Sequence, residues 1–408
     1  MKKLIAISVV FALVAGAVFA VDVSGTVIGT ANVIESSTAK GDKVKASGTM
    51  DRIRLDGAGE TDGSDFGGYI RIQYADWDGN FKPDAAYAWW KPVDQFKLII
   101  GQQSDGFWGK EGVTGWGFNQ IAQDTSVATN PGIWYGWNGV QDPPFGNDDI
   151  SSPYAFGSPY MHNRYTFFEG WLAWGAGMEI TPTDMVGINI AIPYHSYEYP
   201  GDTKGDPKNS AAYIYKAAIA QFDFKLDFGN IALTYDGGGR AVASDGSGGA
   251  IYLYAGLNVI ENLGIDVGFS YHLTDKDIAD YKHPIGVGIG LKYTADSFGV
   301  KFRTSAALAG DDKNTYINTS VMPYFAISDT LSAFINIGLG MQMGDGIKAM
   351  TGGNSSTMGW YFNPYLRAGG EWGPSFYAGV KVESPGLEQK GADNVINWSV
   401  PISLVVSF

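Results

Sequence analysis

The chain has 408 residues, of which 42 are Asp or Glu and 28 are Lys or Arg, and its formal net charge is −14. This acidic balance argues against nucleic acid as a partner, because phosphate contacts need clustered Lys and Arg. The absence of cysteine excludes disulfide bonds and a lipid anchor attached through cysteine. Only 17% of the residues are charged, no long apolar stretch follows the first 20 residues, and helical periodicity is almost absent, which is unusual for a soluble protein of this size.

Residues 1–20 have the pattern of a secretory signal peptide. Lys2 and Lys3 precede an apolar run from Leu4 to Phe19, which ends at Ala20. A basic start, a short apolar core and small residues at the exit are typical of such a peptide. We therefore predict cleavage after Ala20 and a mature chain that forms one domain, residues 21–408. A membrane anchor is the alternative, but the run is short for the roughly 20 residues that a spanning helix needs.

Apolar and polar residues alternate strictly in segment after segment, most clearly in 222–228, 263–273, 285–293 and 396–408. A period of two is that of a β-strand with one apolar face. The pattern predicts about 18 strands, with about 16 as the close alternative. The predicted strands lie near residues 22–33, 46–58, 66–76, 84–91, 95–103, 163–180, 185–198, 211–227, 230–240, 249–260, 263–273, 285–295, 298–309, 315–327, 330–343, 358–371, 374–384 and 395–408.

Tight turns and longer polar connections alternate along the chain. Every tight turn, such as 227–230 or 261–264, follows an even-numbered strand, and longer connections such as 199–210 and 236–248 follow the others. Short turns at one end and long loops at the other are typical of transmembrane barrels, whose short end is periplasmic. Two connections fit less well, because 57–65 is long for a periplasmic turn and 77–80 is short for an external loop.

The polarity of the two strand faces separates a membrane barrel from a soluble β-sandwich, in which residues also alternate. The polar face is crowded with Gly, Ser, Asn and Thr and carries both signs of charge, whereas charges are largely missing from the apolar face. A closed barrel leaves no unpaired backbone edge, as lipid requires. We therefore predict an all-β transmembrane antiparallel barrel with its apolar face outward, and keep a soluble secreted β-protein as the alternative. Aromatic residues near strand ends suit the membrane interfaces, although aromatic residues also favour strands in general.

The chain resembles the bacterial outer-membrane porins in its signal peptide, alternating strands, turn asymmetry and last strand, Trp398 to Phe408, which ends in an aromatic residue. The resemblance implies a multi-pass barrel in the outer-membrane lipid and a water-filled channel for passive diffusion of small polar or ionic solutes. It also implies that Trp398 to Phe408 is read by the barrel-assembly machinery. Porins commonly form trimers, so a homotrimer is the expected assembly.

If the apolar face meets lipid, the other face lines a pore. The basic residues that strand parity places on this face are Arg52, Arg54, Arg71, Lys97, Lys301, Arg303 and Arg367. By the same parity Asp56, Asp223, Asp266, Glu383, Lys225, Lys292 and Lys381 face inward. Basic residues thus outnumber acids on the inner face, although the whole protein is acidic.

The longest connection, residues 104–162, concentrates acidic residues: Asp105, Glu111, Asp124, Asp142, Asp148 and Asp149 stand against Lys110 alone. A loop of this length is usually functional or disordered. The resemblance to porins implies a constriction loop that folds into the barrel. Its acids, facing arginines of the wall such as Arg52, Arg54 and Arg71, would create a transverse field that orients polar solutes. An extracellular loop that only covers the mouth is an equal alternative.

Two other functions stay open for a barrel of this kind. Six of the 12 tryptophans lie between Trp108 and Trp174, and aromatic faces stack on sugar rings, so a sugar-selective porin is one option. The simpler explanation is that these residues pack the loop and the membrane interface. A surface adhesin or receptor, whose loops bind a host or phage component, is the other option.

The sequence gives no support for catalysis, a metal or a cofactor. The four histidines, His162, His195, His272 and His283, form no H-x-x-x-H or H-x-H pattern of the kind that binds zinc. There is no G-x-S-x-G motif and no thiol nucleophile. Asp266, Ser270 and His272 share an inward face, but side chains two apart on a strand point in parallel, whereas a catalytic triad needs precise mutual geometry. We therefore expect a protein without enzymatic activity.

Overall fold

The computed structural model describes residues 20–37, 44–61, 63, 65–75, 81–103, 173–196, 219–236, 250–272, 285–308, 315–343, 356–369, 374–384 and 396–408. The predicted signal peptide, apart from Ala20, and the predicted loop 104–162 lie outside these residues. The strands are β1 (Ala20–Ser37), β2 (Lys45–Glu60), β3 (Phe66–Ala75), β4 (Phe81–Val93), β5 (Phe96–Gln103), β6 (Ala173–Thr183), β7 (Val186–Ser196), β8 (Ile219–Leu226), β9 (Gly229–Asp236), β10 (Ala250–Ile260), β11 (Leu263–His272), β12 (Ile285–Thr294), β13 (Phe298–Leu308), β14 (Thr315–Ser328), β15 (Leu331–Met343), β16 (Ser356–Gly369), β17 (Ser375–Gly379), β18 (Lys381–Ser384) and β19 (Asn397–Ser407).

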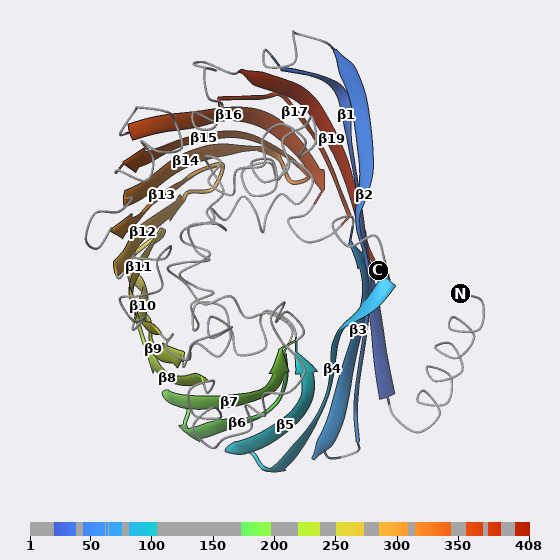
Figure 1. The fold of residues 1–408 in the computed structure, drawn as a ribbon, viewed down its shortest axis with the longest axis vertical. Helices are drawn as coiled ribbons and strands as arrows, with labels where there is room; N and C mark the ends of the chain where they lie inside the picture. The colour runs from blue at the N-terminus through green and yellow to red at the C-terminus, as the bar shows by residue number, and fades with distance from the viewer. Residues whose placement is uncertain are drawn as a thin grey trace, which may run out of the picture.

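The strands form one closed antiparallel barrel. Each strand pairs with its neighbours in the sequence, and β1 pairs with both β2 and β19, which closes the ring (Figure 1). β17 and β18 both pair with β16 and with β19, so they are two halves of one strand. The 19 elements therefore make 19 − 1 = 18 strands. This confirms the predicted all-β barrel and the count of 18, and the alternative of 16 is wrong.

Two prolines explain the interruption between β17 and β18. Val380 donates its N–H to the carbonyl of Pro364 on β16 at 3.0 Å, but Pro364 has no N–H to return to Val380. The β17–β19 register, Ala378↔Ile402, places Gly379 opposite Pro401, which also lacks an N–H. Neither neighbouring strand can donate to this point of the ladder, so the regular pairing stops there.

Most connections follow the predicted asymmetry. Five hairpins, among them β4–β5 and β10–β11, have only two residues between their strands, and all lie at the same end of the barrel as the short connections 61–65, 295–297 and 370–374. The connection 57–65 looks too long only because the predicted strand stops too early. β2 continues to Glu60, and Thr61 donates its N–H to the carbonyl of Phe66 at 2.9 Å. In the two-residue β10–β11 turn Asn262 has φ of 63°, a left-handed conformation that asparagine tolerates.

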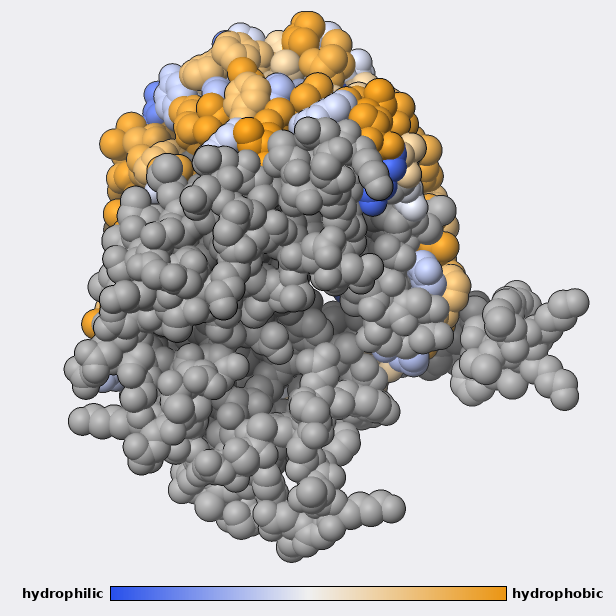
Figure 2. Space-filling view, turned by 45° about the horizontal axis from the view of Figure 1, so that its top comes forward, coloured by the Kyte–Doolittle hydropathy of each residue, from blue (hydrophilic) through white to orange (hydrophobic). Residues whose placement is uncertain are grey.

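The barrel is apolar outside and polar inside. Leu404 of β19 and Phe408, which follows it, lie on the outer face and are 55% and 66% exposed, whereas Asn397, Ser399 and Ser403 of the inner face are 3% exposed or less. The same contrast recurs around the wall, and the described strands carry a largely apolar outer surface in Figure 2. A surface of this kind is stable only in contact with lipid or another apolar partner. Among the described residues, no helix is long and apolar enough to cross a membrane.

A pair of threonines shows how the outer face accommodates polar groups. Thr304 of β13 and Thr319 of β14 are direct register partners, and they alternate with apolar residues on the outer face. Their hydroxyl oxygens lie 3.0 Å apart, so one donates to the other. Because lipid offers no partner to a hydroxyl, this mutual hydrogen bond satisfies both groups at once.

An aromatic stack fills part of the inner face between β14 and β17. Ring centroids are 5.7 Å apart for Tyr324 and Phe334, 4.7 Å for Phe334 and Tyr365, and 6.5 Å for Tyr365 and Tyr377. Met322 and Val405 join the buried residues of this cluster. The rings of Phe334 and Tyr365 are nearly parallel, with an interplanar angle of 6°, and the stack acts as a small core on the inner side of the wall.

Candidate functional site: the inner wall of the barrel

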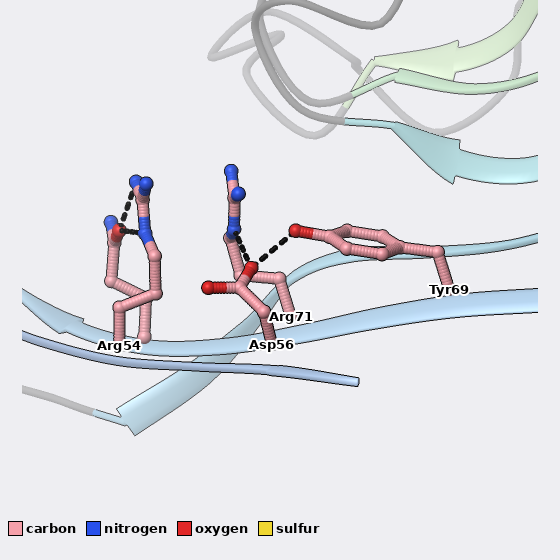
Figure 3. A network of polar contacts seen from close by, with 5 residues as sticks. Arg54, Asp56, Tyr69 and Arg71 are labelled. Atoms are coloured by element: carbon pink, nitrogen blue, oxygen red, sulfur yellow. Dashed lines mark hydrogen bonds and ion pairs between the residues drawn. The ribbon is translucent and has the colours of Figure 1, made fainter. Parts of the chain in front are cut away.

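Two neighbouring arginines on the inner wall have different partners. Arg54 of β2 donates from Nε and Nη2 to Oε1 of Gln73 on β3, at 2.9 and 2.7 Å. Arg71 of β3 donates from Nε to Asp56 of β2 at 2.6 Å, and the Tyr69 hydroxyl donates to the same carboxylate oxygen. All of these side chains stand on one side of the β2–β3 wall (Figure 3). Arg54 thus donates to an amide, and Arg71 donates to a carboxylate.

The predicted residue Lys97 has an acidic partner that the sequence did not reveal. Lys97 of β5 lies opposite Glu179 of β6, with Nζ 3.7 Å from Oε2. The Lys97 ammonium also lies 5.1 Å from the ring centroid of Trp89. Glu179 is the one charged residue of β6, and its position in the alternating pattern places it on the inner face. Only the register shows that it meets Lys97.

Neutral side chains hold two carboxylates further round the wall. Asp223 of β8, which is 8% exposed, accepts a hydrogen bond from Asn189 Nδ2 at 3.0 Å and one from Gln221 Nε2 at 2.7 Å. Asp266 of β11 accepts one from the Tyr254 hydroxyl at 2.5 Å. These contacts fix two carboxylates on the inner face of β8 and β11.

Aromatic rings accompany two basic residues on the β13–β16 arc. Lys301 Nζ lies 5.9 Å from the centroid of Tyr324, and Arg367 Cζ lies 5.0 Å from the centroid of Phe334. A cation over a ring face is attracted by the ring quadrupole, and the ring leaves the net positive charge in place. Lys292 of β12, directly opposite Lys301, has an exposed side chain.

Glycines on the inner wall make room for rings that lie flat across the neighbouring strand. A Cβ atom at Gly67, Gly299 or Gly338 would clash with the ring of Trp89, Tyr324 or Tyr361, respectively. Tyr361 also donates a hydrogen bond to Asn336 at 3.1 Å. Rings placed along the wall occupy less of the lumen than rings that project into it.

Some of the predicted site residues lie wholly or partly outside the described residues. Arg52 pairs with Ile28 and Ala75, and Arg303 pairs with Gly290 and Ser320, but only their backbone is described. The same holds for Ser270 and His272 beside Asp266. The loop acids Asp105, Glu111, Asp124, Asp142, Asp148 and Asp149 are not among the described residues, so their position relative to the wall stays a prediction.

The described inner wall carries more basic than acidic groups and no grouping suited to a metal. Within the described part of the chain, no three His, Asp or Glu side chains come together. By strand alternation, the charged residues with described side chains on the inner face are the bases Lys45, Arg54, Arg71, Lys91, Lys97, Lys225, Lys292, Lys301, Arg367 and Lys381, and the acids Asp22, Glu35, Asp56, Glu60, Glu179, Asp223 and Asp266. Such a wall can attract and hydrate ions.

Comparison with solved structures decides the fold family. No protein-family model and no curated protein matches the sequence. Three proteins of Pseudomonas aeruginosa are similar in structure: OpdL (TM-score 0.55, 8% identity, 95% of this chain and 98% of that one), OpdO (0.53, 10%, 95% and 97%) and OprD (0.51, 10%, 95% and 95%). All three are outer-membrane porins. The chain has the porin fold. Together with the apolar outer face, this fold is that of a multi-pass β-barrel that spans a membrane.

Proposed function

We propose that this barrel is a porin, a water-filled channel through which small polar or ionic solutes cross the outer membrane by passive diffusion. The observation that carries the proposal is the reversed polarity of the wall. Leu404 and Phe408 are exposed on the outer face, whereas charged and hydrogen-bonding side chains occupy the inner face. A polar interior surrounded by lipid is stable when it is hydrated, and a hydrated interior conducts.

The charge of the inner wall supports a preference for anions. Arg54 donates to an amide, and Lys301 and Arg367 lie against aromatic rings, all on the inner face. The pairs Arg71–Asp56 and Lys97–Glu179 are balanced. Asp223 and Asp266 oppose the positive groups, but the described bases outnumber the described acids.

Single-channel recording of the refolded full chain in a planar lipid bilayer tests this proposal. A salt gradient across the bilayer is included so that the reversal potential reports ion selectivity. We expect discrete conductance steps and a reversal potential of the sign that anion flow produces. Protein that is folded and inserted but gives no steps would contradict the channel. Conductance steps with cation selectivity would still support a channel, and would attribute its selectivity to the acidic residues of 104–162.

The other functions rest on residues that the structure does not describe. The tryptophans behind sugar selectivity, the loops behind an adhesin and the constriction loop 104–162 all stay predictions. A homotrimer and recognition of Trp398 to Phe408 by the barrel-assembly machinery stay predictions as well.

A further inference from the structure

The first and last strands close the barrel without a turn between them. β1 and β19, here called the seam, pair from Thr26↔Ser407 to Ser37↔Asn397. All other pairs join strands that follow one another in the sequence, several through two-residue turns. In a hairpin the turn fixes the register. The seam has no such constraint, so its register must come from side chains.

The alternating pattern does not choose between registers that differ by two residues. A slip of one residue would turn an apolar face inward, which the pattern forbids. A slip of two residues keeps every residue of β1 and β19 on its own face, and Val23, Gly25 and Val27 would still lie beside the apolar side of β19. Hydrophobicity alone therefore leaves the closure of the barrel ambiguous.

One specific contact lies on the outer face at the short-turn end of the seam. Gly25 donates its N–H to the Phe408 carbonyl at 2.7 Å, and Phe408 donates its N–H to the Gly25 carbonyl at 3.0 Å. The Phe408 ring lies over Gly25 so closely that a Cβ there would be 2.5 Å from Cζ. A two-residue slip would set the ring against Val23 or Val27, where a branched side chain occupies this space.

A second specific contact lies on the inner face near the other end. β1 has a bulge between Asn32 and Glu35 in its pairing with both β2 and β19. Plain alternation from the inward-facing Asn32 would put Ile34 inside and send the Glu35 carboxylate toward lipid. Instead Val33 and Ile34 are 50% and 39% exposed and Glu35 is fully buried. Bulges commonly re-aim a side chain in this way.

The bulge places the buried Glu35 beside one ammonium group and opposite a buried residue of β19. Lys45 Nζ of β2 is 3.0 Å from Glu35 Oε1. On the other side Glu35 is opposite Ser399 of β19, which is opposite Lys381 of β18, and both of these residues are 1% exposed. A slip of two residues would carry Ser399 and Lys381 about 7 Å along the wall and would set Asn397 or Pro401 opposite the buried Glu35. The surroundings of the buried carboxylate on the β19 side would therefore change, whereas its contact with Lys45 of β2 would be kept.

We propose that Glu35 and Phe408 together set the register in which the barrel closes, one from the inner face and one from the outer face. This role belongs to assembly and is independent of what passes through the lumen. It gives a reason for two local irregularities, the bulge in β1 and the glycine beneath the terminal aromatic ring, that alternation alone would not require.

Cysteine pairs can test the register directly, because the chain has no cysteine of its own. Thr26→Cys with Ser407→Cys reports the observed register, and Thr26→Cys with Val405→Cys reports a two-residue slip. The full chain is refolded into lipid vesicles and oxidised. Cross-linking is then scored on the folded band of an unheated gel. In the otherwise unchanged chain we expect the first pair to cross-link and the second not to.

The proposal predicts that Glu35→Gln and Gly25→Val each lower the ratio of native to slipped cross-link by about tenfold or more, because each removes one determinant of register. Glu35→Asp should restore much of the ratio. Glu179→Gln, which breaks the Lys97–Glu179 ion pair between β5 and β6, away from β1 and β19, is the matched control and should leave it unchanged.

An unchanged ratio in both Glu35→Gln and Gly25→Val would overturn the proposal. If Glu35→Gln yields no folded band, rescue by Glu35→Asp while Glu179→Gln folds normally supports it. Equal loss of folded protein in Glu35→Gln and Glu179→Gln would instead show that any lost ion pair has this effect, and would contradict it.

Discussion

Asp56→Asn should make the channel more selective for anions, because it removes the carboxylate that balances Arg71. The two side chains are 17% and 22% exposed and their ion pair spans 2.6 Å, so the wall changes from a nearly neutral pair to a net positive charge. The substitution keeps the size of the side chain and a hydrogen-bond acceptor for Tyr69. The change in selectivity therefore reports charge rather than shape.

The size of the effect follows from the field of one charge in a hydrated lumen. A permeating ion about 7 Å from the lost charge changes its energy by about 0.6 kcal/mol in water. At 0.1 M salt, screening over a length of about 10 Å reduces this to roughly 0.3 kcal/mol. Because anions gain what cations lose, the permeability ratio of chloride to potassium should rise about two- to threefold.

The assay is the reversal potential of single channels under a salt gradient, measured for the wild type and the variant. Asp329→Asn is the matched control, because Asp329 lies in the β14–β15 turn and its side chain is exposed. We expect no change from this control. A ratio that stays constant or falls in Asp56→Asn would refute the assignment of the pair to the conducting lumen.

Three further predictions test other parts of the wall. Gly338→Ala should push the Tyr361 ring away from the wall and lower single-channel conductance, whereas an unchanged conductance would mean that the ring is accommodated elsewhere. Pro364→Val should restore the missing ladder hydrogen bond and raise the free energy of unfolding by roughly 0.5–1.5 kcal/mol, measured by urea titration in vesicles; a lower free energy would contradict the explanation of the strand break. Changing Thr304 or Thr319 alone to Val should destabilise the barrel by roughly 0.6–1.7 kcal/mol, while the double change should cost less than the sum, and strict additivity in this cycle would count against their hydrogen bond.

The face of each residue was predictable from the sequence, but its partner was not. Alternation alone placed Arg54, Asp56 and Arg71 on one side, and the structure has them on one side (Figure 3). Alternation says nothing about how far one strand is shifted along the next, so the meeting of Lys97 with Glu179 came only from the register. Where a bulge interrupts the alternation, as before Glu35, alternation also predicts the wrong face for the residues that follow.

Strand limits were predicted less well than strand number, for a related reason. The number of strands follows from how often alternating residues give way to turn residues. An error of a few residues in one strand does not change that number. The end of a strand depends on where the last ladder hydrogen bond forms, as at Thr61, whose N–H bonds the carbonyl of Phe66. Likewise the break at Val380 depends on prolines in two other strands. Contacts between segments far apart in the sequence decide both features.

Register links assembly to selectivity, because it determines which charges cancel. In the observed pairing of β2 with β3, Arg54 is opposite Gln73 and Asp56 is opposite Arg71. A shift of two residues would leave the apolar face intact, but it would place Arg54 opposite Arg71 and Asp56 opposite Tyr69. Two like charges would then face each other across the strands, which is unfavourable, and the wall would present a different field to the lumen. The polar pairs therefore favour the register that the turn sets, and they fix the charge that a permeating ion meets.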